Sequence, residues 1–219
     1  MRDAYFDELD SIIDDLVEMT HEVQQAVGRA TQALLTADAE IAEKVISDDA
    51  DIDIARERIE AKSFELLALQ QPVASDLRML IAALRMVADL ERMGDLSVHV
   101  AKVARLRVPQ VAVPPVIVPT IERMAVVAER MVGEVAGIIA ERDVEGARAL
   151  EEDDEEMDQL RRSSFRLMLD DSWPHGVEPA VDIALLGRYY ERIADHAVSL
   201  ARRVVYLVTG ETIGSAADL

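Results

Sequence analysis

ADLERMGDLSVHVAK, residues 88–102, is followed 100 residues later by RYYERIADHAVSLAR, residues 188–202. Each stretch contains Glu-Arg-x-x-Asp among helix-forming residues. A second pair of stretches repeats in the same way: VISDDADID, residues 45–53, aligns with LEEDDEEMD, residues 150–158. Self-similarity at a nearly constant spacing is typical of a structural unit that is used twice. We therefore expect two copies of one unit in tandem.

Six segments of the chain carry apolar residues at seven-residue spacing, which is the pattern of helices that bury one face in a bundle. Aromatic residues make up only 4% of the chain, which favours helix over sheet. The clearest rows are Leu9–Leu16–Val23–Ala30, Val45–Ile52–Ile59–Leu66, Leu77–Leu84–Glu91–Val98 and Ile117–Met124–Met131–Ile138. We predict an all-α fold, a tandem repeat of two three-helix bundles with six helices in all.

Prolines mark the breaks between these segments. RVPQVAVPPVIVP, residues 107–119, contains four prolines and cannot be helical throughout. It is predicted to link a first repeat, residues 1–106, to a second, residues 120–219. Within the first repeat, Asp38 is expected to cap the second helix and Pro72 to end it.

Composition restricts the class of protein. The net charge is −20, from 43 acidic and 23 basic residues, which disfavours binding to nucleic acid. The chain has no cysteine, so disulfides and thiolate ligands are excluded. The charged stretch MRDAYFDELD at its start is unlike a signal peptide, and no apolar run has the length of a membrane span. We expect a cytoplasmic protein.

Each repeat carries two pairs of carboxylates at four-residue spacing, one on its second helix and one on its third. The pairs are Asp49/Asp53, Glu91/Asp95, Asp154/Asp158 and Glu191/Asp195. The third-helix pairs fall in otherwise apolar rows, so we expect them on a buried stripe. If the second and third helices form an antiparallel hairpin, the two pairs of each repeat meet at equal height. Four converging carboxylates repel one another unless a cation, protons or basic side chains neutralise them.

Several partners for these acids remain open at this level. Oxygen ligands suit hard ions such as Mg, Mn or Fe, with Zn an option if histidine joins. Alternatively, Glu91 and Glu191 form salt bridges with a neighbouring Arg85, Arg92, Arg188 or Arg192. The acids could also belong to a solvated face. His99 and His196 lie within a turn of the pairs, where a lone histidine is more often hydrogen-bonded or exposed than a ligand.

An enzyme with a carboxylate-bridged metal centre is the competing class. A ferritin-like centre needs Glu-x-x-His on two core helices, and that spacing occurs only at Glu18–His21, outside the repeated acids. The sequence also lacks a Gly-rich phosphate loop, a G-x-S-x-G elbow and an H-E-x-x-H helix. Catalysis is not indicated.

At DLERMGD (89–95) and YYERIADH (189–196) the chain resembles the PhoU family, the regulators of phosphate uptake. QQPVASDLRML (70–80) and the two Asp-x-x-x-Asp pairs add to the resemblance, which extends over nearly the whole chain. The resemblance implies tandem three-helix bundles, commonly as a homodimer. It also implies metal clusters, often iron or zinc, held by Asp49, Asp53, Glu91 and Asp95 and by Asp154, Asp158, Glu191 and Asp195.

The resemblance further implies a function. Proteins of this family act as adaptors, not enzymes, at the inner face of the membrane. When phosphate is plentiful they couple the ATPase of the phosphate ABC transporter to a membrane sensor histidine kinase. A member of the family is therefore expected to be a negative regulator of phosphate uptake and of phosphate-starvation signalling. The alternative is a ferritin-like protein for metal storage or redox chemistry.

Overall fold

The computed structural model describes residues 2–211, apart from the side chains of residues 2–4 and 152–154. Its helices are α1 (Arg2–Thr36), α2 (Ala39–Gln70), α3 (Ser75–Arg107), α4 (Val118–Glu141), α5 (Val144–Met168) and α6 (Val177–Thr209). No strand occurs between residues 2 and 211. The prediction of an all-α fold with six helices is confirmed.

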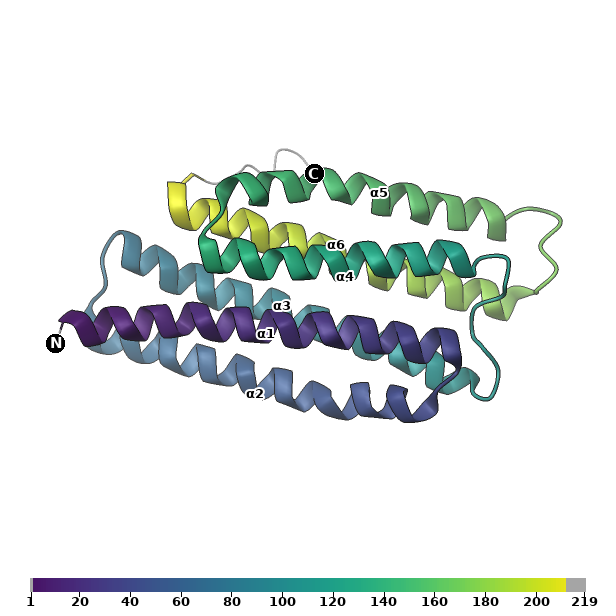
Figure 1. Ribbon diagram of the computed structural model, residues 1–219, viewed down its shortest axis with the longest axis horizontal. Helices are drawn as coiled ribbons and strands as arrows, with labels where there is room; N and C mark the ends of the chain where they lie inside the picture. The colour runs from purple at the N-terminus through teal and green to yellow at the C-terminus, as the bar shows by residue number, and fades with distance from the viewer. Residues whose placement is uncertain (1, 212–219) are drawn as a thin grey trace.

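The helices form two three-helix bundles that lie side by side (Figure 1). In the first bundle α1, α2 and α3 all contact one another, and in the second α4, α5 and α6 do the same. The bundles join through two helix pairs, α1 with α4 and α3 with α6. The α3–α6 pair is antiparallel, since α3 runs away from the α2–α3 turn and α6 returns toward it (Figure 1). The third helices of the two repeats, α3 and α6, therefore face each other where the bundles meet.

Helix ends follow local chemistry. The side chain of Asp38 accepts hydrogen bonds from the backbone N–H groups of Glu40 and Ile41, at 2.9 and 3.0 Å, which satisfies two of the unpaired donors at the start of α2. Asp143 caps α5 in the same way. The helix α2 ends at Gln70, just before Pro72. Both sequence predictions for α2, the cap and the proline stop, are confirmed.

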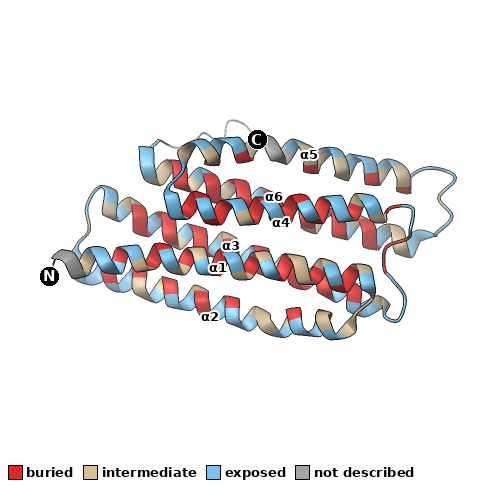
Figure 2. Cartoon of the chain, viewed as in Figure 1, coloured by how far each residue is buried: buried red, intermediate tan, exposed pale blue. Residues whose placement is uncertain are grey.

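The apolar rows predicted for α1, α2 and α4 are all buried in the core (Figure 2). The row predicted for α3 is buried only in part: Val98 is buried and Leu84 is half-buried, but Leu77 is 38% exposed. Leu80, Val87 and Leu90 reach the core beside it. Small residues share that inner face with them, because α3 packs closely against α1, α2 and α6. The first part of the predicted row therefore runs along the edge of the core, and Glu91, the acid of this row, is half-buried at that edge.

None of the helices between residues 2 and 211 is long and apolar enough to cross a membrane.

Candidate functional site

The first acidic cluster consists of Asp49 and Asp53 on α2 and Glu91 and Asp95 on α3. The two helices come close because residue 94 is glycine. A Cβ atom on Gly94 would lie 3.3 Å from Oδ1 of Asp49 and 3.1 Å from a methyl carbon of Ile52. The absence of that atom lets the backbone of α3 approach the carboxylate of Asp49. The prediction that the hairpin brings the two pairs of the first repeat to one height is confirmed.

Negative charge accumulates in this cluster. Burial first, and then the negative charges of Asp95, Asp53 and Glu91, raise the pKa of Asp49 to about 6, while the charge of Lys102 opposes them. The pKa of Glu91 is also raised, first by burial and then by the charge of Asp95. At neutral pH the ionised carboxylates therefore repel one another across the α2–α3 contact.

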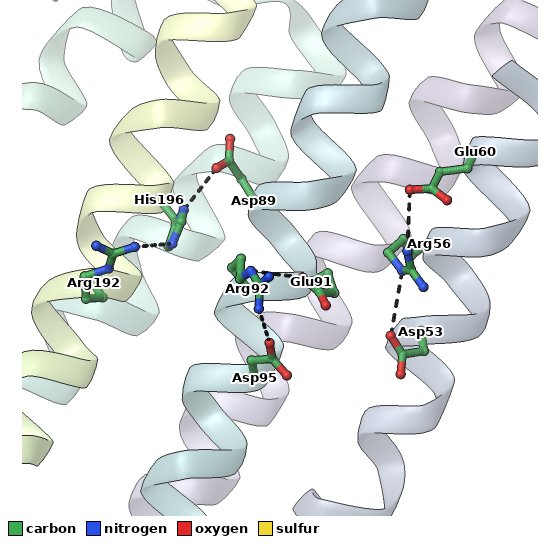
Figure 3. Close-up of polar contacts among 9 residues, drawn as sticks. All are labelled: Asp53, Arg56, Glu60, Asp89, Glu91, Arg92, Asp95, Arg192 and His196. Atoms are coloured by element: carbon green, nitrogen blue, oxygen red, sulfur yellow. Dashed lines mark hydrogen bonds and ion pairs between the residues drawn. The ribbon is translucent and has the colours of Figure 1, made fainter. Parts of the chain in front are cut away.

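Two arginines, Arg92 and Arg56, partly neutralise the cluster by pairing with three of its acids (Figure 3). Nη1 of Arg92 donates to Asp95 at 2.9 Å, and its Nε lies 3.6 Å from Glu91. Nε of Arg56 lies 3.7 Å from Asp53, on the same helix. Pairing of Glu91 with Arg92 is thus confirmed. These ion pairs are largely solvated and contribute little to stability, and neither arginine lies within ion-pair distance of Asp49.

The second cluster has different chemistry. Glu191 on α6 is buried, with 8% of its surface exposed, and both of its carboxylate oxygens are bonded to arginines. Nη1 of Arg161, on α5, donates to Oε1 at 3.0 Å, and Nη1 of Arg188 donates to Oε2 at 2.6 Å. The expected pairing with Arg188 is confirmed. Arg161 was not among the predicted partners, although it aligns with Arg56 of the first repeat, 105 residues earlier.

The other acids of the second cluster do not join Glu191 in one group. Asp158 pairs with Arg162 of its own helix at 2.9 Å. Asp195 is exposed, and its pKa is raised first by burial of part of the carboxylate and then by the charge of Glu191. The side chain of Asp154 lies outside the described residues.

The two clusters differ in how well they suit a metal. The first offers four carboxylates, of which Asp49 has no arginine partner, and carboxylate oxygens are the ligands that hard divalent cations prefer. In the second, a cation would have to displace two guanidinium groups from Glu191, so the residues present there do not fit one. No group of three or more acidic or histidine side chains lies close enough together to hold an ion, among the side chains that the structure describes. Metal binding at the eight predicted residues stays a prediction.

Asp89 is a polar residue that the sequence analysis missed. It lies on α3 at the join with α6 and accepts three hydrogen bonds: from Nδ1 of His196 at 3.0 Å (Figure 3), from Oγ of Ser199 at 3.1 Å and from Nε of Arg203 at 2.8 Å. Burial disfavours its ionised form, but the bonds from His196 and Arg203 outweigh burial and lower the pKa of Asp89. The two bundles are thus joined by a partly buried polar network.

One sequence signal could have indicated this role. Asp89 lies two residues before Glu91, so the two side chains point to opposite sides of α3. Glu91 faces α2, and Asp89 therefore faces away from α2, toward the second bundle. His196 lies one residue after the acidic pair Glu191/Asp195. Its bond to Asp89 agrees with the expectation that a lone histidine there is hydrogen-bonded rather than a metal ligand.

The structure gives no support to the ferritin-like alternative. Glu18 forms a salt bridge with Arg58 at 3.2 Å, and His21 is exposed on the surface of α1. Among the described residues, neither side chain forms a hydrogen bond or an ion pair with the acidic pairs.

The structure is a tandem of two three-helix bundles, and each bundle carries an acid pair on its second and on its third helix. This is the architecture that the resemblance to phosphate-uptake regulators indicated. The chain belongs to the PhoU family: the PhoU domain matches it twice, at residues 16–104 and 121–204. It is 46% identical, over 210 residues, to the phosphate-specific transport system accessory protein PhoU homolog 2 of Mycobacterium tuberculosis, and the match covers 96% of this chain and 99% of that one.

Two crystal structures share the fold. The phosphate transport system regulatory protein PhoU of Streptococcus pneumoniae superimposes with a TM-score of 0.87 at 26% identity, over 96% of this chain and 99% of that chain. PhoU of Pseudomonas aeruginosa superimposes with a TM-score of 0.84 at 29% identity, over 94% and 100% of the two chains. The prediction of a PhoU-like tandem fold is confirmed.

Proposed function

We propose that this protein is a negative regulator of phosphate uptake that works as an adaptor in the cytoplasm. In this role it binds the ATPase of the phosphate ABC transporter and a membrane sensor histidine kinase when phosphate is plentiful. It restrains uptake, keeps the starvation response off, and acts as a homodimer without a catalytic step of its own. The observation that carries the proposal is the relationship to phosphate transport accessory proteins along 96% of the chain.

The surface of the third helix of each repeat supports an adaptor role. Leu77 and Ile81 on α3 leave apolar surface in contact with solvent, and so do Val177 and Val181 at the positions 100 residues later on α6. Exposed apolar side chains of this kind commonly mark contact surfaces for other proteins. Because α3 and α6 are antiparallel, the two rows begin at opposite ends of the molecule, which gives an adaptor two separate surfaces for two partners.

Deletion of the gene tests the regulatory role. Transcripts of phosphate-starvation genes should rise in phosphate-rich medium and return to the basal level when the full chain is supplied again. Affinity purification from phosphate-replete cells should recover the transporter ATPase and a sensor kinase. Unchanged transcripts together with the absence of both partners would refute the adaptor proposal.

A metal role is the second part of the proposal and concerns the first cluster. Asp49, Asp53, Glu91 and Asp95 would hold the ion, with Fe, Zn, Mn and Mg as the candidates that oxygen ligands suit. A bound divalent cation would supply positive charge where the four carboxylates repel. The role of the ion would be structural or regulatory, because it would fix α2 against α3. The four acids would hold it at the point where the two helices approach closely, beside Gly94.

Thermal unfolding of chelator-treated protein tests the metal role. Because an ion that binds only the folded state stabilises it, adding Mn, Fe or Zn should raise the melting temperature. Asp49→Asn should reduce this rise, whereas Glu191→Gln should leave it unchanged. A rise of equal size in Asp49→Asn would place the ion elsewhere, and no rise in the wild-type protein would contradict metal binding at either cluster.

A further inference from the structure

A basic pocket lies at the join of the two bundles, on the side of Asp89 away from the acidic clusters. It has a volume of about 250 Å³ and lies between the first half of α3 and the last turns of α6. Three arginines line it: Arg85 from α3, and Arg202 and Arg203 from α6. The concentration of guanidinium groups is unexpected, because the chain as a whole carries a net charge of −20.

The arginines of α6 are held in place by acids through their Nε atoms. Nε of Arg202 donates to Glu151 at 2.8 Å, and Nε of Arg203 donates to Asp89 at 2.8 Å. A guanidinium group has five N–H donors in a planar fork, so pairing through Nε leaves terminal N–H groups for a ligand. The two acids thus orient the arginines without using all of their donors.

Arg85 completes the pocket from the opposite wall. It is exposed, and it forms no ion pair or hydrogen bond with any residue that the structure describes. The three guanidinium groups therefore face two carboxylates, which leaves one positive charge without a partner. Tyr206 adds a phenolic hydroxyl to the lining, and the side chains of Ile81 and Ala82 form its apolar part.

We infer that this pocket binds a small phosphate-type oxyanion between α3 and α6. Planar guanidinium groups match the geometry of tetrahedral oxyanions through paired N–H···O bonds, and several of them together favour a dianion. The volume lies below the range of roughly 300–1,000 Å³ typical of sites for drug-sized ligands. The pocket therefore takes the free ion or a small phosphomonoester rather than a nucleotide.

An anion in this pocket contacts the residues that join the repeats. Arg203 shares Asp89 with His196 and Ser199, so a ligand on Arg203 adds to the same network that fixes α3 against α6. Binding would stabilise this join, because the anion bridges Arg85 of the first bundle and Arg202 of the second. The inference does not depend on the proposed adaptor function, since it concerns the isolated protein.

Calorimetric titration of the full chain with inorganic phosphate tests the inference. Chelator-treated protein is used, so that phosphate cannot bind through a metal at the acidic clusters, and sodium chloride holds the ionic strength constant. We expect saturable binding of phosphate that chloride does not reproduce. Arg85→Gln and Arg202→Gln should each raise the dissociation constant about tenfold or more, because each removes charge-assisted hydrogen bonds to the ligand.

Arg166→Gln is the matched control, because Arg166 is an exposed arginine of α5 outside the pocket. It makes the same change in net charge and should alter the dissociation constant less than twofold. A parallel titration with glycerol phosphate separates the two sources of the anion: tighter binding of the ester assigns the pocket to a phosphomonoester, and tighter binding of phosphate assigns it to the free ion. The inference is wrong if neither anion binds saturably, or if Arg166→Gln weakens binding as much as the pocket variants do.

Discussion

Replacing Asp49 by asparagine should stabilise the metal-free protein at neutral pH. Asparagine keeps the size of the side chain and removes the charge that Asp95, Asp53 and Glu91 repel. Burial and these charges raise the pKa of Asp49 from 3.8 to about 6 in the folded protein, so ionising it costs more in the folded state than in the unfolded chain. The substitution removes this cost.

The size and the pH dependence of the stabilisation by Asp49→Asn follow from the raised pKa of Asp49. About two pKa units at 1.36 kcal/mol per unit set an upper limit of about 3 kcal/mol. Solvent reaches part of the carboxylate and screens its neighbours, so we expect about 1–2 kcal/mol. Because the folded-state pKa is raised, wild-type stability from this group is complete below pH 3.8 and is lost as the pH rises to about 6. The advantage of the variant should therefore be full above pH 6, about half at pH 5 and absent below pH 3.8.

Thermal and urea unfolding of chelator-treated proteins measure the difference. For a chain of this length 1 kcal/mol corresponds to roughly 2–4 °C, so Asp49→Asn should melt a few degrees above wild type at pH 7.5. Asp171→Asn, in the exposed turn before α6, is the control and should change little. A destabilised Asp49→Asn protein, or an advantage that does not shrink between pH 7.5 and pH 5, would refute this electrostatic account of the first cluster.

Three further changes have definite expected outcomes. Glu191→Gln should lower the free energy of unfolding by about 1–3 kcal/mol in urea titrations, since it leaves two arginines without their buried carboxylate; wild-type stability would contradict the salt-bridge account. Gly94→Ala should destabilise the protein by about 1–3 kcal/mol, because the added Cβ would lie 3.1 Å from the side chain of Ile52. Gly137→Ala is the control: a Cβ there would meet nothing within 4 Å, so the substitution should stabilise the protein by up to about 1 kcal/mol. Equal effects of the two substitutions would refute the close approach of α2 and α3 at Gly94. Asp89→Asn should weaken the α3–α6 join and speed amide exchange in both helices, and exchange confined to its own turn would argue against a network that joins the bundles.

The parts of the fold that depend on local sequence could be predicted. The cap at Asp38, the stop at Pro72 and the doubled pattern each involve residues close together in the chain, so spacing and residue type are sufficient. The alignment of the acid pairs across the α2–α3 hairpin could be predicted too. A short turn between two helices fixes which of their residues lie opposite each other. The metal assignment remains a prediction. In its second half, Asp158 and Glu191 are bonded to arginines, and the side chain of Asp154 lies outside the described residues.

Contacts between distant elements could not be predicted in this way. The inner face of α3 was misassigned in part because large apolar residues dominated the pattern, whereas Ala83 and Gly94 occupy core positions where neighbouring helices approach closely. Asp89 was missed because its partners come from α6, more than a hundred residues later. Which side of a helix is buried depends on how many helices surround it, and α3 contacts three.

The two repeats show how one motif acquires two chemistries. Arg56 and Arg161 occupy equivalent positions, yet Arg56 stays within ion-pair distance of acids on its own helix, while Arg161 crosses to the glutamate of the third helix. The second guanidinium in the second repeat comes from Arg188, and the equivalent residue of the first repeat is Ala88. The Glu-Arg-x-x-Asp motif is the same in both, so the arginine one turn before the glutamate, together with the course of Arg161, distinguishes a neutralised salt bridge from a cluster whose negative charge is only partly compensated. The first repeat therefore keeps negative charge that arginines neutralise in the second, and metal binding at the first repeat stays the prediction to test.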